Sequence, residues 1–244
     1  INNQFFILQY LKYINLFTEI LPFIFFVFYY KSIETKNKKV FFLYTLLITL
    51  LVIAVVITRY ILDSYSSYYI VVRVYNVIEY SALAYLFFLY IKSKLIRTAL
   101  LYSIIPYTLF CIFDFITAKE PTLALVPLII EYIVLLLFIV YFFFEVMQQT
   151  IVEPIYQKAI FWISVAFIIN FSGNFFLLLS SLNSFNNETF RNTFIVINGS
   201  VTILKNIFLC IAVVLKENNN DNQVLKDLSI DSELDSFLSF KRQN

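Results

Sequence analysis

Seven apolar stretches of about 20 residues each follow one another along this chain of 244 residues. A helix of that length rises about 30 Å, which is enough to cross the hydrocarbon core of a bilayer. Hydrophobic residues make up 61% of the sequence and charged residues only 14%, whereas roughly a quarter of the residues in a soluble domain are charged. Too little polar sequence remains to cover a soluble globule. The sequence therefore predicts an all-α, seven-helix transmembrane bundle.

The predicted spans are about 13–30, 40–62, 68–91, 98–117, 122–146, 158–180 and 194–215. The basic residues of the connecting loops predict their direction. Loops 31–39 and 92–97 carry Lys31, Lys36, Lys38, Lys39, Lys92, Lys94 and Arg97, whereas the opposite loops carry Lys119 and Arg191. Short cytoplasmic loops are enriched in lysine and arginine. We therefore expect the N-terminus outside and the C-terminus in the cytoplasm.

Spans 1 and 5 share a pattern that indicates an internal repeat. Span 1 reads EILPFIFFVFYY from Glu19, and span 5 reads EYIVLLLFIVYFFFE from Glu131. Both run in the same direction, because span 5 comes four spans after span 1 and the direction alternates from one span to the next. The pattern predicts a 3+1+3 arrangement of two parallel repeats, and chance similarity in so apolar a chain is the alternative.

Six polar residues are expected near the middle of the membrane: Lys205, Glu79, Glu19, Glu131, Asn170 and Asn206. A lone ionised group at that depth costs at least ~2.5–3.5 kcal/mol. We expect Lys205 to pair with Glu79, with Glu19 and Glu131 as the alternatives. The remaining glutamates, protonated or hydrated, would suit a proton-linked switch. The alternative is an ion pair that only fixes the order of the helices.

A second polar layer is expected nearer the outside. Two ion pairs could form at the outer mouth of the bundle, as structural braces or as a ligand gate, from Arg73, Asp114, Arg59 and Asp63.

The two glycines of the chain, Gly173 and Gly199, lie in spans 6 and 7. Small residues allow helices to approach closely, so we expect a close contact between these two spans or a small polar pocket.

Enzymatic, metal-binding and nucleic-acid functions find little support in the sequence. Histidine, the commonest metal ligand and the usual general base, is absent. The two cysteines, Cys111 and Cys210, lie in apolar runs and are expected as buried small side chains. Motifs of intramembrane, metallo- or serine hydrolases and phosphate-binding loops are missing. A net charge of +2 gives no electrostatic footprint for nucleic acid.

The order of these features resembles the retinal proteins, which have seven spans, a lysine in the seventh and a carboxylate in the third. The resemblance implies retinal on Lys205 as a Schiff base, with Glu79 in VIEYS as its counterion. The chain departs from that pattern at Val201, one turn before the lysine, and at Trp162, near the inner end of span 6. The Phe-, Ile-, Asn- and Lys-rich sequence also resembles seven-helix sensor-related membrane proteins of AT-rich bacteria, which implies a bacterial inner membrane.

Residues 216–244 form a polar tail after the predicted bundle of residues 1–215. Within it, residues 224–240 can form a short acidic amphipathic helix, which suits docking on a cytoplasmic protein better than on a membrane surface. A frayed end is the alternative.

We expect a receptor-like or accessory module that relays a signal through the buried Glu/Lys cluster. A small proton-coupled transporter is the second hypothesis, and a retinal protein is the third.

Overall fold

The computed structural model describes residues 2–29, 36–118, 125–148, 154–184 and 187–215. Within these ranges the chain forms seven α-helices and no strand. The helices are α1 (Asn2–Phe28), α2 (Lys36–Val56), α3 (Tyr65–Tyr90), α4 (Lys94–Thr117), α5 (Leu125–Met147), α6 (Ala159–Ser184) and α7 (Glu188–Val214). A π-helical turn, η2 (Ile57–Ile61), continues α2, and a short 3₁₀ turn, η3 (Ile155–Gln157), precedes α6. The predicted tail helix at 224–240 lies outside the described residues.

The helices have the length and the surface of membrane spans. Six of them, α2 to α7, are long and apolar enough to cross a membrane, and α1 contributes a shorter apolar part, Tyr13–Phe28. Large apolar side chains such as Ile116, Met147 and Phe176 are mostly exposed on the outside of the bundle, as expected for a surface in contact with lipid. The prediction of an all-α membrane bundle is confirmed. The direction of the spans and the internal repeat remain predictions.

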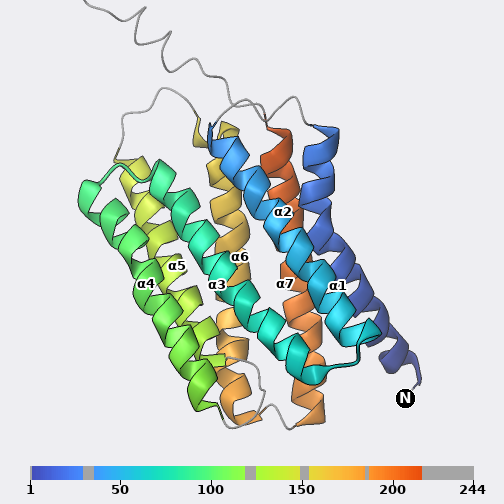
Figure 1. Cartoon of the computed structure of the whole chain (residues 1–244). Helices are drawn as coiled ribbons and strands as arrows, with labels where there is room; N and C mark the ends of the chain where they lie inside the picture. Colours follow the sequence, from blue (N-terminus) through green and yellow to red (C-terminus); the bar gives the residue numbers. More distant parts are fainter. Residues whose placement is uncertain (1, 30–35, 119–124, 149–153, 185–186, 216–244) are drawn as a thin grey trace, which may run out of the picture.

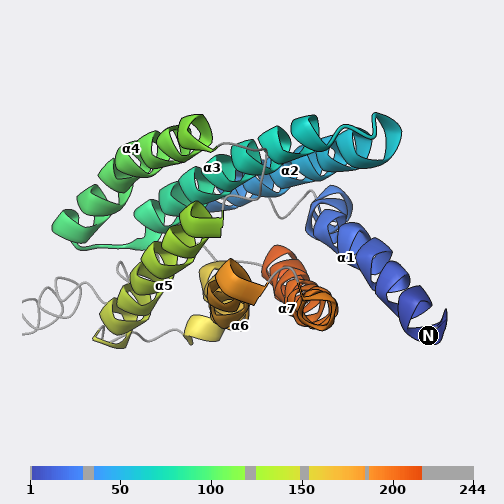
Figure 2. The ribbon, with the colours of Figure 1, turned by 90° about the horizontal axis from the view of Figure 1, so that it is seen from below.

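The seven helices form a closed ring in two layers. Viewed along the helices, α4, α3 and α2 lie in one layer and α5, α6 and α7 in the other, with α1 beside α2 and α7 (Figure 2). Each helix contacts the next one in the chain, α1 closes the ring against α7, and α3 also contacts α5 across the middle. The N-terminal ends of α1, α3, α5 and α7 all lie at one end of the bundle (Figure 1). We call this end the N-side half, and the opposite end the C-side half.

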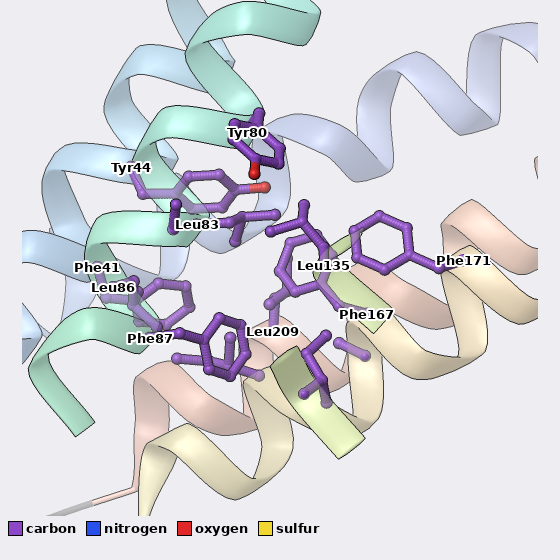
Figure 3. Close-up of a cluster of buried hydrophobic side chains, with 14 of the residues drawn as sticks. Phe41, Tyr44, Tyr80, Leu83, Leu86, Phe87, Leu135, Phe167, Phe171 and Leu209 are labelled. Carbon is purple, nitrogen blue, oxygen red and sulfur yellow. The ribbon is translucent and has the colours of Figure 1, made fainter. Parts of the chain in front are cut away.

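The C-side half is filled by apolar side chains. Five of these side chains come from five different helices, belong to one buried cluster and are each at most 2% exposed (Figure 3). They are Phe41, Phe87, Leu135, Phe167 and Leu209. Lipid tails are as apolar as these side chains, so close packing rather than the hydrophobic effect holds such helices together.

Two polar contacts tie the helices together at the C-side end. The carboxylate of Glu145 on α5 accepts hydrogen bonds from the backbone N–H groups of Lys92, at 2.8 Å, and Ser93, at 2.7 Å, just before α4. Backbone N–H groups at a helix start lack intrahelical partners and favour a negative charge. Lys38 on α2 donates to the backbone carbonyl of Leu215, which follows the last residue of α7. The first contact links α5 to α4, and the second links α2 to the end of α7.

The two glycines mark close approaches to two different helices. A Cβ atom on Gly173 of α6 would lie 2.8 Å from Cγ2 of Val201 on α7, which is the expected contact between spans 6 and 7. A Cβ atom on Gly199 of α7 would instead lie 3.3 Å from Cδ2 of Leu11 on α1. The expectation that Gly199 packs against span 6 was therefore wrong, because α7 turns this face toward α1.

Candidate functional site

A polar cavity of about 300 Å³ occupies the N-side half of the bundle. Six helices line it, and α4 is the helix without a lining residue. The cavity extends from Leu125, the first residue of α5, to the level of Glu79 and Lys205 in the middle of α3 and α7. Beyond that level lies the apolar cluster of the C-side half. The site is therefore a pocket with one end at the predicted outer face and the other at the centre of the membrane.

Amide side chains dominate the polar part of the wall. The lining asparagines are Asn15, Asn76, Asn170, Asn174 and Asn198. On α6 the side-chain Nδ2 of Asn174 donates to Oδ1 of Asn170 at 3.2 Å. Tyr75, Tyr132 and Thr202 add hydroxyl groups to the wall. Buried amides and hydroxyls are costly unless they find partners, so this wall requires polar contents.

Lys205 forms an ion pair with Glu19 of α1. Its Nζ lies 3.2 Å from Oε1 and 3.4 Å from Oε2 of Glu19, and the two side chains are 4% and 13% exposed. The expected first-choice partner, Glu79, was wrong, and the alternative Glu19 is the residue that the structure places against the lysine. The reason is the closure of the ring, which packs α1 directly on α7.

Glu79 lies on the same cavity wall without a salt bridge among the described residues. Its Oε1 accepts long hydrogen bonds from the hydroxyl groups of Tyr44 on α2, at 3.4 Å, and Tyr75 on its own helix, at 3.5 Å. The residue is only 5% exposed. Tyr44 also belongs to the apolar cluster of Figure 3. Glu79 therefore lies at the floor of the cavity, where the polar half of the bundle meets the apolar half.

Glu131 is separate from this cluster. It is fully buried and does not line the cavity, and its Oε2 accepts a hydrogen bond from the hydroxyl of Tyr107 on α4 at 2.8 Å. The ring of Tyr107 stacks on Tyr80, with 4.1 Å between the ring centroids. Glu131 therefore faces α4 rather than the cavity, and its expected place among the polar residues near the centre of the membrane remains a prediction.

The two expected asparagines have different surroundings. Asn170 lines the cavity as part of the amide pair on α6. Asn206 is 1% exposed and does not line the cavity, and its Nδ2 donates to Oγ1 of Thr18 on α1 at 3.4 Å. Asn206 and Lys205 therefore form two neighbouring contacts between α7 and α1.

Both expected pairs of the outer layer are close enough for salt bridges, but neither lines the cavity. Arg73 Nη1 lies 2.6 Å from Asp114 Oδ2, at an apolar groove between α3 and α4. Arg59 Nη1 lies 3.4 Å from Asp63 Oδ1 near the turn between α2 and α3, with side chains that are 34% and 82% exposed. Both pairs therefore form on the N-side half without lining the cavity. Their role as braces remains a prediction.

Several residues of the site were missed by sequence analysis that followed ionisable groups. These are Asn15, Asn76, Asn174, Asn198, Thr202, Tyr44, Tyr75 and Tyr132. A signal for them was present in their spacing. Asn15 precedes Glu19 by four residues, and Asn174 follows Asn170 by four. Residues four apart share one face of a helix, so these pairs mark the faces that look into the cavity.

The cavity does not fit retinal. A polyene chain offers no hydrogen bonds to the five asparagines of the wall, and buried polar groups without partners are costly. Glu79, the counterion expected from the retinal resemblance, does not contact Lys205. The indole of Trp162 stacks on Phe208, with 5.7 Å between centroids, and its Nε1 donates to the carbonyl of Tyr156. These contacts hold the tryptophan away from the cavity.

No family model, curated protein or solved structure matches this chain.

Proposed function

We propose that this chain is a receptor-like module of a membrane that binds a small polar ligand in the cavity of the N-side half. The occupant changes the contacts of α7, and the change reaches the segment after Leu215. The observation that carries this proposal is the contrast between the two halves of the bundle. One half holds a polar cavity that ends at Glu79 and Lys205, and the other is filled by apolar side chains.

Helix α7 is the element that connects the cavity to the C-side end. It contributes Asn198, Thr202 and Lys205 to the cavity or its ion pair. Ten residues beyond Lys205, about 15 Å along a helix, the carbonyl of Leu215 accepts a hydrogen bond from Lys38. A ligand that alters the Lys205–Glu19 contact would therefore act on the same rigid helix that Lys38 holds. Helix shifts of about 1–2 Å are a common form of such switching.

A small proton-coupled transporter is the second candidate, and it would have to open a path through the C-side half in another conformation, because alternating access exposes a central site to one face at a time. In the conformation described, side chains of the C-side half, including Phe87, Phe167 and Leu209, are at most 2% exposed. Binding at one face with a relay to the other requires no such path. We also place the protein in a bacterial inner membrane with its N-terminus outside, and we propose residues 224–240 as the part that contacts a cytoplasmic protein.

Spin labels at the C-side end test the relay. In a background with Cys111 and Cys210 replaced by alanine, labels at Lys39 and Val214 report the distance between the ends of α2 and α7. We expect Lys205→Met and Glu19→Gln each to shift this distance by on the order of 2 Å. Labels at Lys94 and Met147, on α4 and α5, provide the control pair and should not respond.

A matched variant tests whether the change in distance depends on the Lys205–Glu19 pair or follows the loss of any ion pair. Asp63→Asn removes the exposed ion pair with Arg59, and it should leave both distances unchanged. An unchanged distance between Lys39 and Val214 in both cluster variants would reject the relay.

A further inference from the structure

The cavity wall carries more carboxyl groups than basic groups. The lining residues include the carboxyl groups of Glu19 and Glu79 and a single basic group, the ammonium of Lys205. Among the described residues, Lys205 forms its ion pair with Glu19, and the hydrogen bonds to Glu79 come from the hydroxyls of Tyr44 and Tyr75. Those two hydrogen bonds, at 3.4 and 3.5 Å, are longer than the usual limit of about 3.0 Å for a hydroxyl donor. The floor of the cavity therefore presents a carboxyl group that forms no salt bridge with a cation of the described residues.

The unsatisfied polar atoms of the bundle are all acceptors. Among the described residues, four buried side-chain oxygens have no hydrogen-bond partner: Asn15 Oδ1, Glu131 Oε1, Asn174 Oδ1 and Asn206 Oδ1. Two of these residues, Asn15 and Asn174, line the cavity, and Asn174 is only 2% exposed. Buried polar atoms without partners are rare in folded proteins. An occupant that donates hydrogen bonds would satisfy the two on the cavity wall.

The size and the apolar part of the wall limit the occupant further. A volume of about 300 Å³ lies at the small end of ligand pockets and corresponds to roughly ten water molecules. Val52, Val55, Leu128 and Leu178 supply apolar surface beside the polar groups. A short aliphatic body with a cationic, hydrogen-bond-donating end matches both parts of the wall.

We propose that the cavity binds a small primary ammonium compound, with Glu79 as the counterion and the side-chain oxygens of Asn174 and Asn15 as acceptors. This assignment rests on the proposed receptor function and names the chemical class of its ligand. A primary ammonium group carries three N–H donors and no acceptor. It can therefore donate hydrogen bonds to the unpaired acceptors of the wall. A bare monovalent metal ion offers the same charge to carboxylate and amide oxygens, and the experiment separates the two.

The test uses the full chain purified in detergent and probes of matched size. Butylammonium is compared with butanol, butyrate, tetramethylammonium and sodium chloride. A dye that reacts with thiols reports unfolding, because Cys111 and Cys210 are free and buried. We expect butylammonium to raise the unfolding temperature saturably. The neutral and anionic probes, the ion without N–H groups and sodium should leave it unchanged.

Variants with opposite expected effects separate binding from stability. By calorimetry, Glu79→Gln should weaken butylammonium binding at least about tenfold, or about 1.4 kcal/mol. Asn174→Asp adds a negative charge to the wall and should strengthen it. Asp63→Asn removes an exposed carboxyl group that does not line the cavity, and it should leave the affinity unchanged.

Several results would overturn the assignment. These are equal stabilisation by sodium or tetramethylammonium, saturable binding of butyrate or butanol in place of the amine, no response to any primary amine, or an unchanged affinity in both Glu79→Gln and Asn174→Asp. Each of these leaves the spin-label test of the relay intact. Conversely, amine binding without any movement of α7 would reject the relay and keep the ligand class.

Discussion

Replacing Lys205 with methionine removes the ammonium group that lies 3.2 Å from Glu19 and leaves that carboxylate in a site where it is only 13% exposed. Breaking a buried ion pair on one side typically costs about 3–5 kcal/mol. For a chain of this size, each kcal/mol lowers the unfolding temperature by roughly 2–4 °C. We therefore expect Lys205→Met to unfold about 6–20 °C below the wild type, and Glu19→Gln to behave similarly.

The double variant tests whether the loss of stability comes from the contact between Glu19 and Lys205. Glu19→Gln combined with Lys205→Met leaves two neutral side chains, so it should recover much of the loss. Coupling energies of residues in contact are about 0.5–3 kcal/mol. The same cycle on Glu79 and Lys205 should give a smaller coupling, because no salt bridge joins them. Thermal unfolding in detergent, followed by dye labelling of Cys111 and Cys210, measures all the variants in one assay.

The exposed pair of Arg59 and Asp63 is the control for this cycle. Its side chains are 34% and 82% exposed, and surface ion pairs contribute only about 0–1 kcal/mol. Asp63→Asn should therefore shift the unfolding temperature little. Additive losses for Glu19 and Lys205, or a larger coupling for Glu79 than for Glu19, would refute the assigned pairing and the geometry of the cavity floor with it.

Three further predictions test other parts of the bundle. Gly173→Ala should destabilise the protein by about 1–3 kcal/mol through overpacking, since the new Cβ meets Val201 at 2.8 Å, and adding Val201→Ala should restore thermal stability. Glu145→Gln weakens two charge-assisted hydrogen bonds to backbone N–H groups and should cost about 1–3 kcal/mol in the same assay, whereas a neutral result would mean that the contact is dispensable. An impermeant thiol reagent applied to intact cells should label Ser66→Cys and spare Lys94→Cys, and the reverse pattern would invert the predicted direction of the spans.

The fold could be predicted from the sequence because it follows from local properties. The length and hydropathy of each run determine where a membrane helix forms, and the observed α3, Tyr65–Tyr90, overlaps nearly all of the predicted span 68–91. The depth of a polar residue follows from the same count along the helix. Glu19, Glu79 and Lys205 were accordingly expected at similar depth, and the structure gathers all three on the wall of one cavity.

The ion pairing among these residues could not be predicted, because it depends on which helices are neighbours and on how each helix is rotated about its axis. The packing of α1 on α7 decides that Glu19 rather than Glu79 meets Lys205, and it also turns Gly199 toward Leu11. Hydropathy carries no information on either arrangement. The asparagines are a different case, since their spacing with Glu19 and with one another was visible in the sequence. Asn170 was predicted, whereas the other four lining asparagines were missed because the prediction followed charged residues.

The contrast between the two halves of the bundle bears on why the polar cavity exists. The C-side half demonstrates that this chain can fill a bundle interior with closely packed apolar side chains. Apolar residues in place of a buried ion pair are often neutral or stabilising by about 1–4 kcal/mol. The N-side half nevertheless keeps an ion pair, a second carboxyl group and unpaired amide oxygens around one cavity. The proposed occupant, which brings positive charge and hydrogen-bond donors, would give this set a role other than stability. In the proposed receptor, α7 would transmit the effect of binding, because it runs from this cavity to the carbonyl that accepts a hydrogen bond from Lys38.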